Sequence, residues 1–561
     1  MPACSPELTI ATCNRGDTTV GGTALAIMRR QKVKQSLAVA FAFVSALCCS
    51  LAALAQKPGG ILRLYHPDSP ANMSVLESET VSVIGPMMAV FNNLLVYDQH
   101  VPQNSFDTLR PDLAESWSWR DDGKELTFKL RQGISWHDGR PFTAADVKCT
   151  WELIQERSND RLRTNPRKSW YTNVEDVAVE GPYEVTFRLG RPQPALLALL
   201  AGGHSPIYPC HVAAAEMRRH PIGTGPFKFV GYKAGESIKL MRNPNYWKPG
   251  RPYLDGIEYT IVPNRSTAIL GFIAGTFDMT FPYGVTVPLL RDVQAQVPHG
   301  TCQITPTNVS TNLLLNQTKP PFDNLGLRRA VALALDRTAF AHILMKGQAL
   351  IGGAMLPPPA GVWGLRSDAL ATSPGYDGQV ERNRSEARRI MDRLGYGPEK
   401  RLDLTVSARD APAYRDASVI LIDQLKHIWI GGTLHAIETA NWYPKLSRKD
   451  YTIALNLTGS AIDDPDQQFF ENYACGTVRN FSGYCSPEME KLFVVQSVDT
   501  DQARRKELVW HIDSKLQQEV ARPIIYHSHA ATCWHPQVKG LTVMVNSIYN
   551  GWRMEDVWLD K

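Results

Sequence analysis

Two stretches of the sequence carry side chains able to bind a charged group or a metal ion. The run Asp463-Asp464-Pro465-Asp466 could hold a cationic group such as an amine, although aspartate before proline is also a common turn and helix start. His527-Ser528-His529, with Cys533 and His535 nearby, would place two imidazoles on one face of a strand, which suits a transition metal. The alternative interpretation is a polar strand and loop with one disulfide cysteine. These stretches are the first candidates for ligand chemistry.

Common catalytic motifs are missing from the sequence. It has no Gly-x-Ser-x-Gly elbow, no His-Glu-x-x-His pair and no Gly-x-x-x-x-Gly-Lys phosphate loop. The glycines of Gly223-Thr224-Gly225 precede Pro226, which lacks the backbone N–H that a phosphate cradle uses, so a tight turn is favoured. The motifs therefore give no sign of an enzyme, and we expect neither catalytic activity nor a cofactor.

The composition is that of a folded, nearly neutral protein. The chain has 561 residues, too many for one hydrophobic core, and 43% of them are hydrophobic and 20% charged. Its net charge of +5 falls to +2 when the five basic and two acidic residues of 1–55 are left out. The sequence has no basic stripe with interleaved aromatic residues, so nucleic acid is not an expected partner.

The N-terminal region has the layout of a secretory signal peptide. A short basic stretch at 28–34 is followed by the mainly apolar residues 36–55, which end in Ala53-Leu54-Ala55 before Gln56. This small-x-small ending is typical of a cleavage site, although about 20 apolar residues could also remain as a membrane anchor. We expect residues 1–55 to be the signal region, with Met28 as an alternative start, and the mature chain to reside in the periplasm.

Export determines how the cysteines are interpreted. Six cysteines follow residue 55, and an even number in an oxidising compartment favours disulfides. Cys475 and Cys485 are separated by a short loop and are the predicted pair. The pairing of the other four cysteines stays open at this point.

Alternating strand-like and helix-like segments predict an α/β fold. Glu115–Trp119 and Leu126–Leu130 alternate in polarity on either side of an Asp-Asp-Gly turn, as half-buried strands do. Thr143 with Asp146 forms a capping-box pattern at the start of a helix. Further predicted elements are a helical stretch over 74–95 with a kink or break at Pro86, a β-hairpin over 227–241, a β-α-β unit over 402–439, a helix over 501–520 and a strand at 523–526.

Four ordered motifs extend over nearly the whole chain after residue 55. The most extended runs from Leu113-Ala-Glu-Ser-Trp117 through Trp136-His-Asp-Gly139 to Pro141-Phe-Thr-Ala-Ala-Asp-Val147. The others are Gly223–Phe229 with Arg242–Trp247, Pro321–Asp323 with Leu327–Arg337, and Tyr484–Leu492. In type and order these motifs resemble the extracellular solute-binding proteins of family 5, the class that serves oligopeptide and dipeptide importers.

The resemblance implies a bilobal periplasmic-binding-protein fold with an extra small domain, three domains in all. The implied ranges are 56–97, 216–315 and 526–561 for a discontinuous lobe I, 98–215 for the small domain, and 316–525 for lobe II. Two chain crossings, near Leu315 and Ile525, would form the hinge. If Cys302 and Cys533 lie on neighbouring hinge strands, we expect them to pair.

The resemblance also implies a solute site between the lobes. Peptide binders of this family commonly place an aspartate a few residues before the Asp/Glu-Pro turn, where it neutralises the amino group of the peptide. Here the turn is Asp464-Pro465 and the corresponding position is Ala461, so either Asp463 takes this role or the solute is not a free-amine peptide. The predicted ligand-binding residues are Asp463, Asp464, Trp442, Asn456, Ser460, Tyr283 and Asn312.

The function implied by the resemblance is solute capture for an ABC importer. The protein, expected to be a monomer, would close its lobes around a peptide or similar small solute and deliver it to a membrane permease and ATPase. A ligand sensor or chaperone-like binding protein that is not coupled to transport is the alternative. A secreted hydrolase is a weaker alternative, because it would need a nucleophile and a base that the sequence does not reveal.

Overall fold

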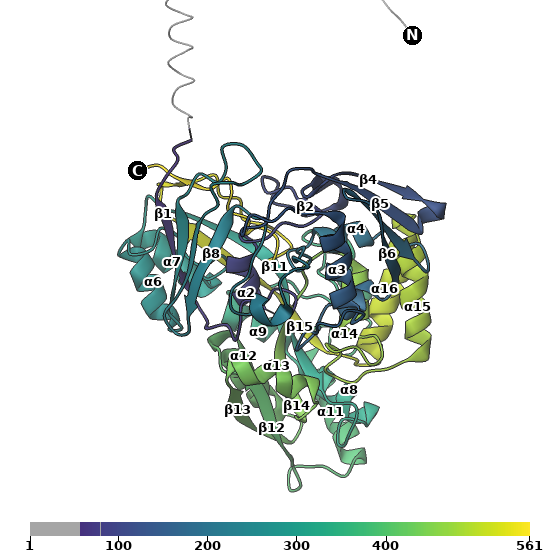
Figure 1. Ribbon diagram of the computed structural model, residues 1–561. Helices are drawn as coiled ribbons and strands as arrows, with labels where there is room; N and C mark the ends of the chain where they lie inside the picture. Colours follow the sequence, from purple (N-terminus) through teal and green to yellow (C-terminus); the bar gives the residue numbers. More distant parts are fainter. Residues whose placement is uncertain (1–55, 79) are drawn as a thin grey trace, which may run out of the picture. The chain divides into compact units, whose positions relative to one another are not determined.

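The computed structural model describes residues 56–78 and 80–561, and this part of the chain contains three sheets of four or five strands (Figure 1). Strands and helices are interleaved along the chain, which confirms the predicted α/β class. The predicted signal region at 1–55 lies outside the described residues. No helix in the described ranges is both long and apolar enough to cross a membrane.

The first sheet combines the start of the described chain with a later hairpin. Its order is β1 (Ile61–His66), β10 (Gly256–Ile261), β9 (Ser237–Arg242) and β8 (Phe227–Lys233). Strands β8 and β9 pair antiparallel, which confirms the predicted hairpin, while β1 runs parallel to β10. Helix α6 (Arg265–Ile273) follows β10 and packs against α7 (Val287–Gln296).

The second sheet contains the β-α-β unit. Its order is β13 (Ile430–Ile437), β12 (Leu402–Arg409), β14 (Ile453–Gly459), β11 (Thr301–Leu315) and β15 (Ile524–Trp534). Strands β12 and β13 are parallel and are joined by α12 (Pro412–Lys426), as the sequence predicted. The helices around this sheet are α8 (Leu325–Ala334), α9 (Arg337–Met345), α11 (Val380–Arg393) and α13 (Thr439–Ser447).

The third sheet is an antiparallel meander. Its order is β4 (Ala114–Arg120), β5 (Glu125–Leu130), β7 (Glu184–Leu189) and β6 (Val174–Gly181), and α3 (Ala144–Ile154) packs against it. Thr143 and Asp146 form the predicted capping box at the start of α3. The buried side chains of this sheet and of the first sheet belong to one apolar core.

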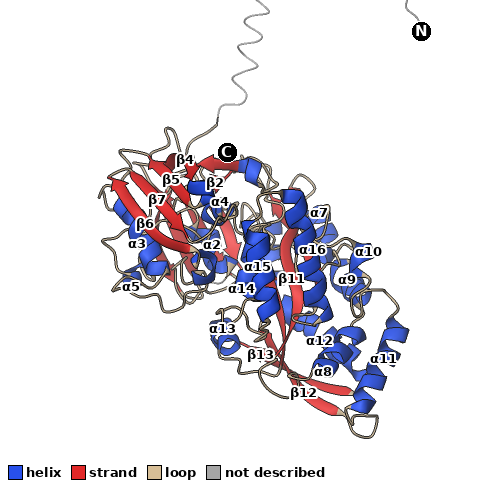
Figure 2. Cartoon of the chain, turned by 90° about the vertical axis from the view of Figure 1, so that its right-hand side faces the viewer, coloured by secondary structure: helices blue, strands red, loops and turns tan. Residues whose placement is uncertain are grey.

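Three helices form a separate bundle near the end of the chain: α14 (Pro465–Asn472), α15 (Pro487–Val498) and α16 (Gln502–Gln518), which lie side by side in Figure 2. Their apolar side chains form their own core, in which the rings of Phe469 and Phe493 stack with centroids 5.1 Å apart. Helix α16 begins after the N-cap residue Asp501, close to the predicted start.

The helical stretch predicted over 74–95 is helical only in part. The described residues form α2 (Val81–Met87), which ends directly after Pro86, the predicted kink or break, and β2 (Leu95–Tyr97) follows. Nearly all of its described residues are buried. The apolar spacing therefore reflects packing on several sides and not one buried face of a helix.

Strands β11 and β15 connect two apolar cores. The first half of β11 and the last half of β15 pack with Phe272 and Val293 in one core. Leu313 on β11 and Ile525 on β15 belong to the other core, that of the second sheet. Between these parts the β11–β15 ladder is interrupted from Pro306 to Ser310. The two strands thus change their surroundings at the interruption.

The described chain contains three disulfides. Cys302 and Cys533 occupy paired positions on β11 and β15 and are bonded, as the resemblance led us to expect. The other two bonds join Cys475 to Cys485, the pair predicted from the sequence, and Cys149 to Cys210.

Candidate functional site

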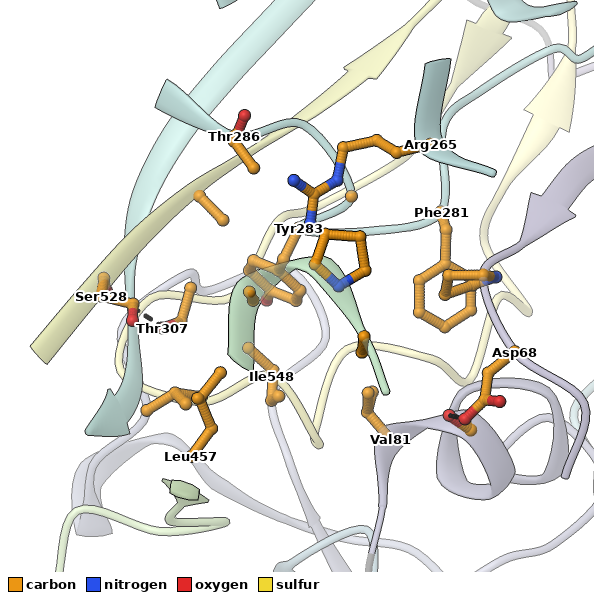
Figure 3. Close-up of a pocket in the computed structure, with 18 of the residues that line it drawn as sticks. Asp68, Val81, Arg265, Phe281, Tyr283, Thr286, Thr307, Leu457, Ser528 and Ile548 are labelled. Carbon is orange, nitrogen blue, oxygen red and sulfur yellow. Dashed lines mark hydrogen bonds between the residues drawn. The ribbon is translucent and has the colours of Figure 1, made fainter. Parts of the chain in front are cut away.

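A cavity of about 390 Å³ lies between the first and second sheets (Figure 3). Its walls come from the segments after β1 and β10, from the loop before α7, and from the ends of β12 and β14. Much of the lining is apolar, including Val81, Val262, Phe281, Leu457 and Ile548. Its volume is in the range of about 300–1,000 Å³ typical of small-molecule sites.

The floor of the cavity is the interruption in the β11–β15 ladder. Thr307 and Val309 on β11 and Ser528 and His529 on β15 line it. The hydroxyl of Thr307 donates to the carbonyl of Ser528 at 3.1 Å, so one cross-strand contact replaces the regular ladder. Because the regular register is lost here, side chains of both strands can face the cavity.

Tyr283 is fixed in the wall by three hydrogen bonds. Its hydroxyl is directed at the carbonyls of Met544, at 2.7 Å, and Ser547, at 3.1 Å, and its backbone N–H donates to the hydroxyl of Thr532 at 2.9 Å. Its φ of 60° is in the left-handed region, which is uncommon for a bulky residue. The contacts hold this strained conformation, and the ring lines the cavity in a defined position.

An ion pair joins the two sides of the cavity. Asp68, just after β1, accepts from the guanidinium of Arg409, the last residue of β12. Asp68 also accepts from the hydroxyl of Ser82 at 3.1 Å, and Nε of Arg409 donates to the hydroxyl of Thr439 at 2.8 Å. Each charge therefore has a partner of opposite sign, and the hydrogen bonds fix the orientation of both side chains.

The remaining ionisable groups of the lining are Tyr65, Arg265, Asp410 and His529. Asp410 pairs with Arg415 at 2.6 Å. Burial lowers the pKa of His529, so this imidazole is neutral at pH 7. The cavity as a whole is thus apolar with a small number of charged groups, an arrangement that orients a solute by a few polar contacts.

Of the seven ligand-binding residues predicted from the sequence, Tyr283 lines this cavity and the other six do not. Asp464 is buried, caps α14 through the N–H of Asp466, and forms an ion pair with Arg505 at 2.8 Å. Asp463 accepts from the backbone N–H of Val362 at 2.8 Å. The acidic cluster thus lies at the start of α14, which agrees with the interpretation of this run as a turn and helix start.

Asp463 has an unusual environment. Its Oδ1 is buried without a hydrogen-bond partner in the described residues. Burial, with a contribution from the charge of Asp464, raises the pKa of Asp463 to about 7. Its carboxyl group is therefore partly protonated near neutral pH.

The four other predicted residues take part in buried hydrogen bonds within the protein. Trp442 donates to Asn456 at 3.4 Å, and Asn456 and Asn312 both donate to the hydroxyl of Thr458, at 3.1 and 2.9 Å. Ser460 contacts the side-chain oxygen of Gln468 at 3.2 Å. Their roles in ligand binding stay predictions, because no contact here tests them.

The histidines of 527–529 point to different surroundings. His527 is buried and bonded to the carbonyl of Gly353 at 3.0 Å, whereas His529 lines the cavity. Among residues 56–78 and 80–561, no group of three or more His, Cys, Asp or Glu side chains is placed to hold a metal ion.

Sequence reasoning missed Tyr65, Asp68, Arg265 and Arg409. Each lies at an element boundary, and contact between them depends on how the two sheets are placed. One signal was available for Arg265. It follows the N-cap Asn264 directly, and a cation at the positive end of a helix breaks a local rule, as functional residues often do.

The comparison with known families identifies the chain. Residues 108–480, more than half of the chain, match the family described as bacterial extracellular solute-binding proteins, family 5, middle region. The chain belongs to this family. A relative in the family 5 class, di/tripeptide-binding protein 1 of Pseudomonas aeruginosa, is 26% identical over 480 residues, which cover 80% of this chain and 85% of the relative.

Solved structures share the fold of this family 5 protein. The periplasmic binding protein DppA from Helicobacter pylori, in complex with a peptide STSA, superposes with a TM-score of 0.79 at 20% identity, covering 90% of this chain and 99% of DppA. AgaA from A. tumefaciens R10, in complex with agropinic acid, gives a TM-score of 0.77 at 22% identity, with 90% and 99% covered. The predicted periplasmic-binding-protein fold is therefore confirmed.

Proposed function

We propose that this family 5 protein is the periplasmic solute-binding component of an ABC importer and that it binds a small solute, a peptide or a molecule of similar size, in the cavity described above. The observation that carries the proposal is the cavity of about 390 Å³ itself, with walls from two different sheets and a floor where the connecting strands lose their regular pairing. A solute held there contacts both sides, so its binding favours a closed arrangement.

The relatives support the same type of function. They are a di/tripeptide-binding protein, an ABC transporter-associated periplasmic binding protein in complex with a peptide, and a binding protein in complex with agropinic acid. By analogy, the partners of this chain are a membrane permease and its ATPase, and the chain acts as an exported monomer. The three disulfides support an oxidising compartment.

The three-domain division stays part of this proposal, with lobe I at 56–97, 216–315 and 526–561, the small domain at 98–215, and lobe II at 316–525. The hinge stays proposed near Leu315 and Ile525, where β11 and β15 pass between lobe I and lobe II. Both residues are buried in the core of the second sheet. The interruption of the β11–β15 ladder between Pro306 and Ser310 supports bending of the two strands a few residues from these crossings.

Binding without turnover is the proposed activity. Ser82, which lines the cavity, donates its hydroxyl to Asp68, and Asp68 is held by Arg409. A carboxylate in an ion pair is a weak base for activating a hydroxyl. A sensor that binds without transport would share the same cavity, and uptake of the solute by cells with and without the permease separates the two functions.

The test is a thermal-shift screen of residues 56–561 with peptides, amino-acid derivatives, sugar acids and metal chelates. A solute at about 100 times its Kd stabilises the folded state by about 2.7 kcal/mol, a measurable rise in Tm. Ser528→Phe fills the cavity from β15 and Leu457→Trp from β14, so both variants should lose this rise.

Ser118→Phe on the exposed face of β4 is the matched control and should keep the rise in Tm. An equal rise in the wild type and in both folded cavity-filling variants would place the solute elsewhere. A chain that responds to none of these solutes would contradict the proposed function.

A further inference from the structure

Arg265 is an uncompensated cation in the cavity. It lines the cavity from the first position of α6, and neither a hydrogen bond nor an ion pair joins its guanidinium to another group of the protein in the described residues. Figure 3 shows the side chain extending from α6 toward Tyr283. Burial lowers the pKa of Arg265, and the charge of Asp416, an exposed residue of α12, opposes this effect.

Tyr65 provides a second unused donor in the same wall. Its side chain is 2% exposed, and its hydroxyl has no hydrogen-bond partner in the part of the chain that the structure describes. A Cβ atom at Gly284 would lie 2.4 Å from this hydroxyl, so only glycine allows the cavity wall to approach it so closely. Burial raises the pKa of Tyr65, whereas the charge of Arg265 lowers it, which indicates that the two groups interact.

The other charges of the lining do not compensate Arg265. Asp68 is paired with Arg409, Asp410 with Arg415, and these pairs leave no lining carboxylate for a second cation. A buried hydroxyl without a partner and a half-buried guanidinium without a hydrogen-bonded counter-ion both destabilise the free protein. An acceptor with negative charge would satisfy both at once.

Helix α6 adds to the positive potential at this position. Arg265 is its first residue, and its first turn contains no acidic side chain. A cation is disfavoured at the positive end of a helix, whereas an anion is favoured there. The placement of an arginine at this point is unfavourable for the free protein and favourable for binding of an anion.

On the basis of the function proposed above, we infer that the solute is an anion with an apolar body, and that Arg265 and the hydroxyl of Tyr65 bind its carboxylate. The guanidinium matches the planar geometry of a carboxylate, and the apolar lining contacts the rest of the solute. The lining offers no free carboxylate to an ammonium group, so a blocked or absent amine is compatible with the site.

The test uses matched pairs of ligands in isothermal titration. The probes are N-acetylated dipeptides of apolar residues, each as the free acid and as the carboxamide, measured with residues 56–561. The wild type should bind the acid roughly tenfold or more tightly than the amide, the order expected for a hydrogen bond to a charged group. Arg265→Gln should remove this preference, whereas Arg291→Gln, an exposed arginine of α7 outside the lining, should keep it.

Tyr65→Phe separates binding from a merely structural role. Because the hydroxyl is buried and unpartnered, its removal should raise the Tm of the free protein and at the same time weaken binding of the acid. A fall of the Tm together with unchanged affinity would contradict the inferred role of Tyr65.

The inference and the proposed function can fail separately. If acids and amides bind equally well, or if Arg265→Gln keeps the preference for acids, the solute is not bound through Arg265, although solute binding as such stands. If neither member of any pair binds at about 1 mM while a cationic or neutral solute of the thermal-shift screen does, the inference is also wrong. If no solute of the wider screen binds, the proposed function itself is contradicted.

Discussion

At the scale of single residues, neighbouring carboxylates in one acidic cluster have different environments. Asp464 has a buried arginine partner, whereas Asp463 has a single backbone donor and an unpartnered oxygen. The difference arises from contacts with residues about 40 and 100 positions away in the sequence. The cluster could be found from the sequence, but the environment of each carboxylate could not, since it depends on these distant contacts.

Asp463→Asn should change the pH dependence of stability. In the unfolded chain an aspartate has a pKa of about 3.9, whereas the folded-state pKa of Asp463 is about 7. The native state therefore binds an extra proton between these values, and the contribution of Asp463 to stability decreases as the pH rises from about 4 to about 7. The asparagine variant lacks this term, so its Tm relative to the wild type should be higher at pH 8 than at pH 5.

The matched control is Asp423→Asn, an exposed aspartate of α12. Its Tm difference from the wild type should be the same at both pH values. A constant difference for Asp463→Asn would mean that the carboxyl group is ionised throughout the range.

The same variant tests the sequence prediction that Asp463 binds the solute. Loss of solute affinity without a change in the pH dependence of Tm would favour that role.

At the scale of elements, the sequence predicts correctly those helices, strands and turns whose signal lies within a few neighbouring residues. The hairpin β8–β9, the β12-α12-β13 unit and the capping box of α3 follow from alternation, glycine positions and a four-residue motif. The helical prediction for 74–95 holds only for α2, because the residues of this stretch are buried on several sides and their spacing does not mark one helix face. The bundle α14–α16 shows a further limit, because its charged contacts join helices about 40 residues apart.

Arg505→Met should strongly destabilise the bundle α14–α16. Arg505 lies on α16, is almost fully buried, and pairs with Asp464 at 2.8 Å and with Asp466 at 3.2 Å. Removing it leaves two buried carboxylates without their cation, and breaking such a buried pair costs about 3–5 kcal/mol. The free energy of unfolding from urea denaturation measures the effect.

Arg504→Met is the control for this substitution. Arg504 is the neighbouring residue on α16, is exposed, and pairs with Asp499 at the surface at 2.6 Å. Its loss should change stability far less. Equal effects of the two variants would show that the buried ion pairs do not stabilise the bundle.

At the scale of the whole molecule, function depends on how the two sheets are placed around the cavity. The resemblance gave the class of protein, the fold and a site between lobes, because the motifs extend over most of the chain. The lining itself comes from eleven separate segments between Tyr65 and Ile548, and no local pattern predicts which of them meet. Tyr283 is the predicted residue that the structure brings to the cavity.

The ion pair of Asp68 with Arg409 is the clearest contact across the cavity. It joins the segment after β1 to the end of β12 and is mostly buried, with 19% and 12% of the two side chains exposed. A partly buried charge pair of this kind favours one relative placement of the two walls. A solute that contacts both walls would add to the same preference.

A crystal structure of residues 56–561 with the solute that gives the largest rise in Tm would test the proposed site most directly. We expect the solute to occupy the cavity between the first and second sheets, with its carboxylate at Arg265 and Tyr65 and its body against Phe281, Leu457 and Ile548. A solute bound outside this cavity, for example beside Asp463, would show that the cavity is not the binding site and would favour the acidic cluster.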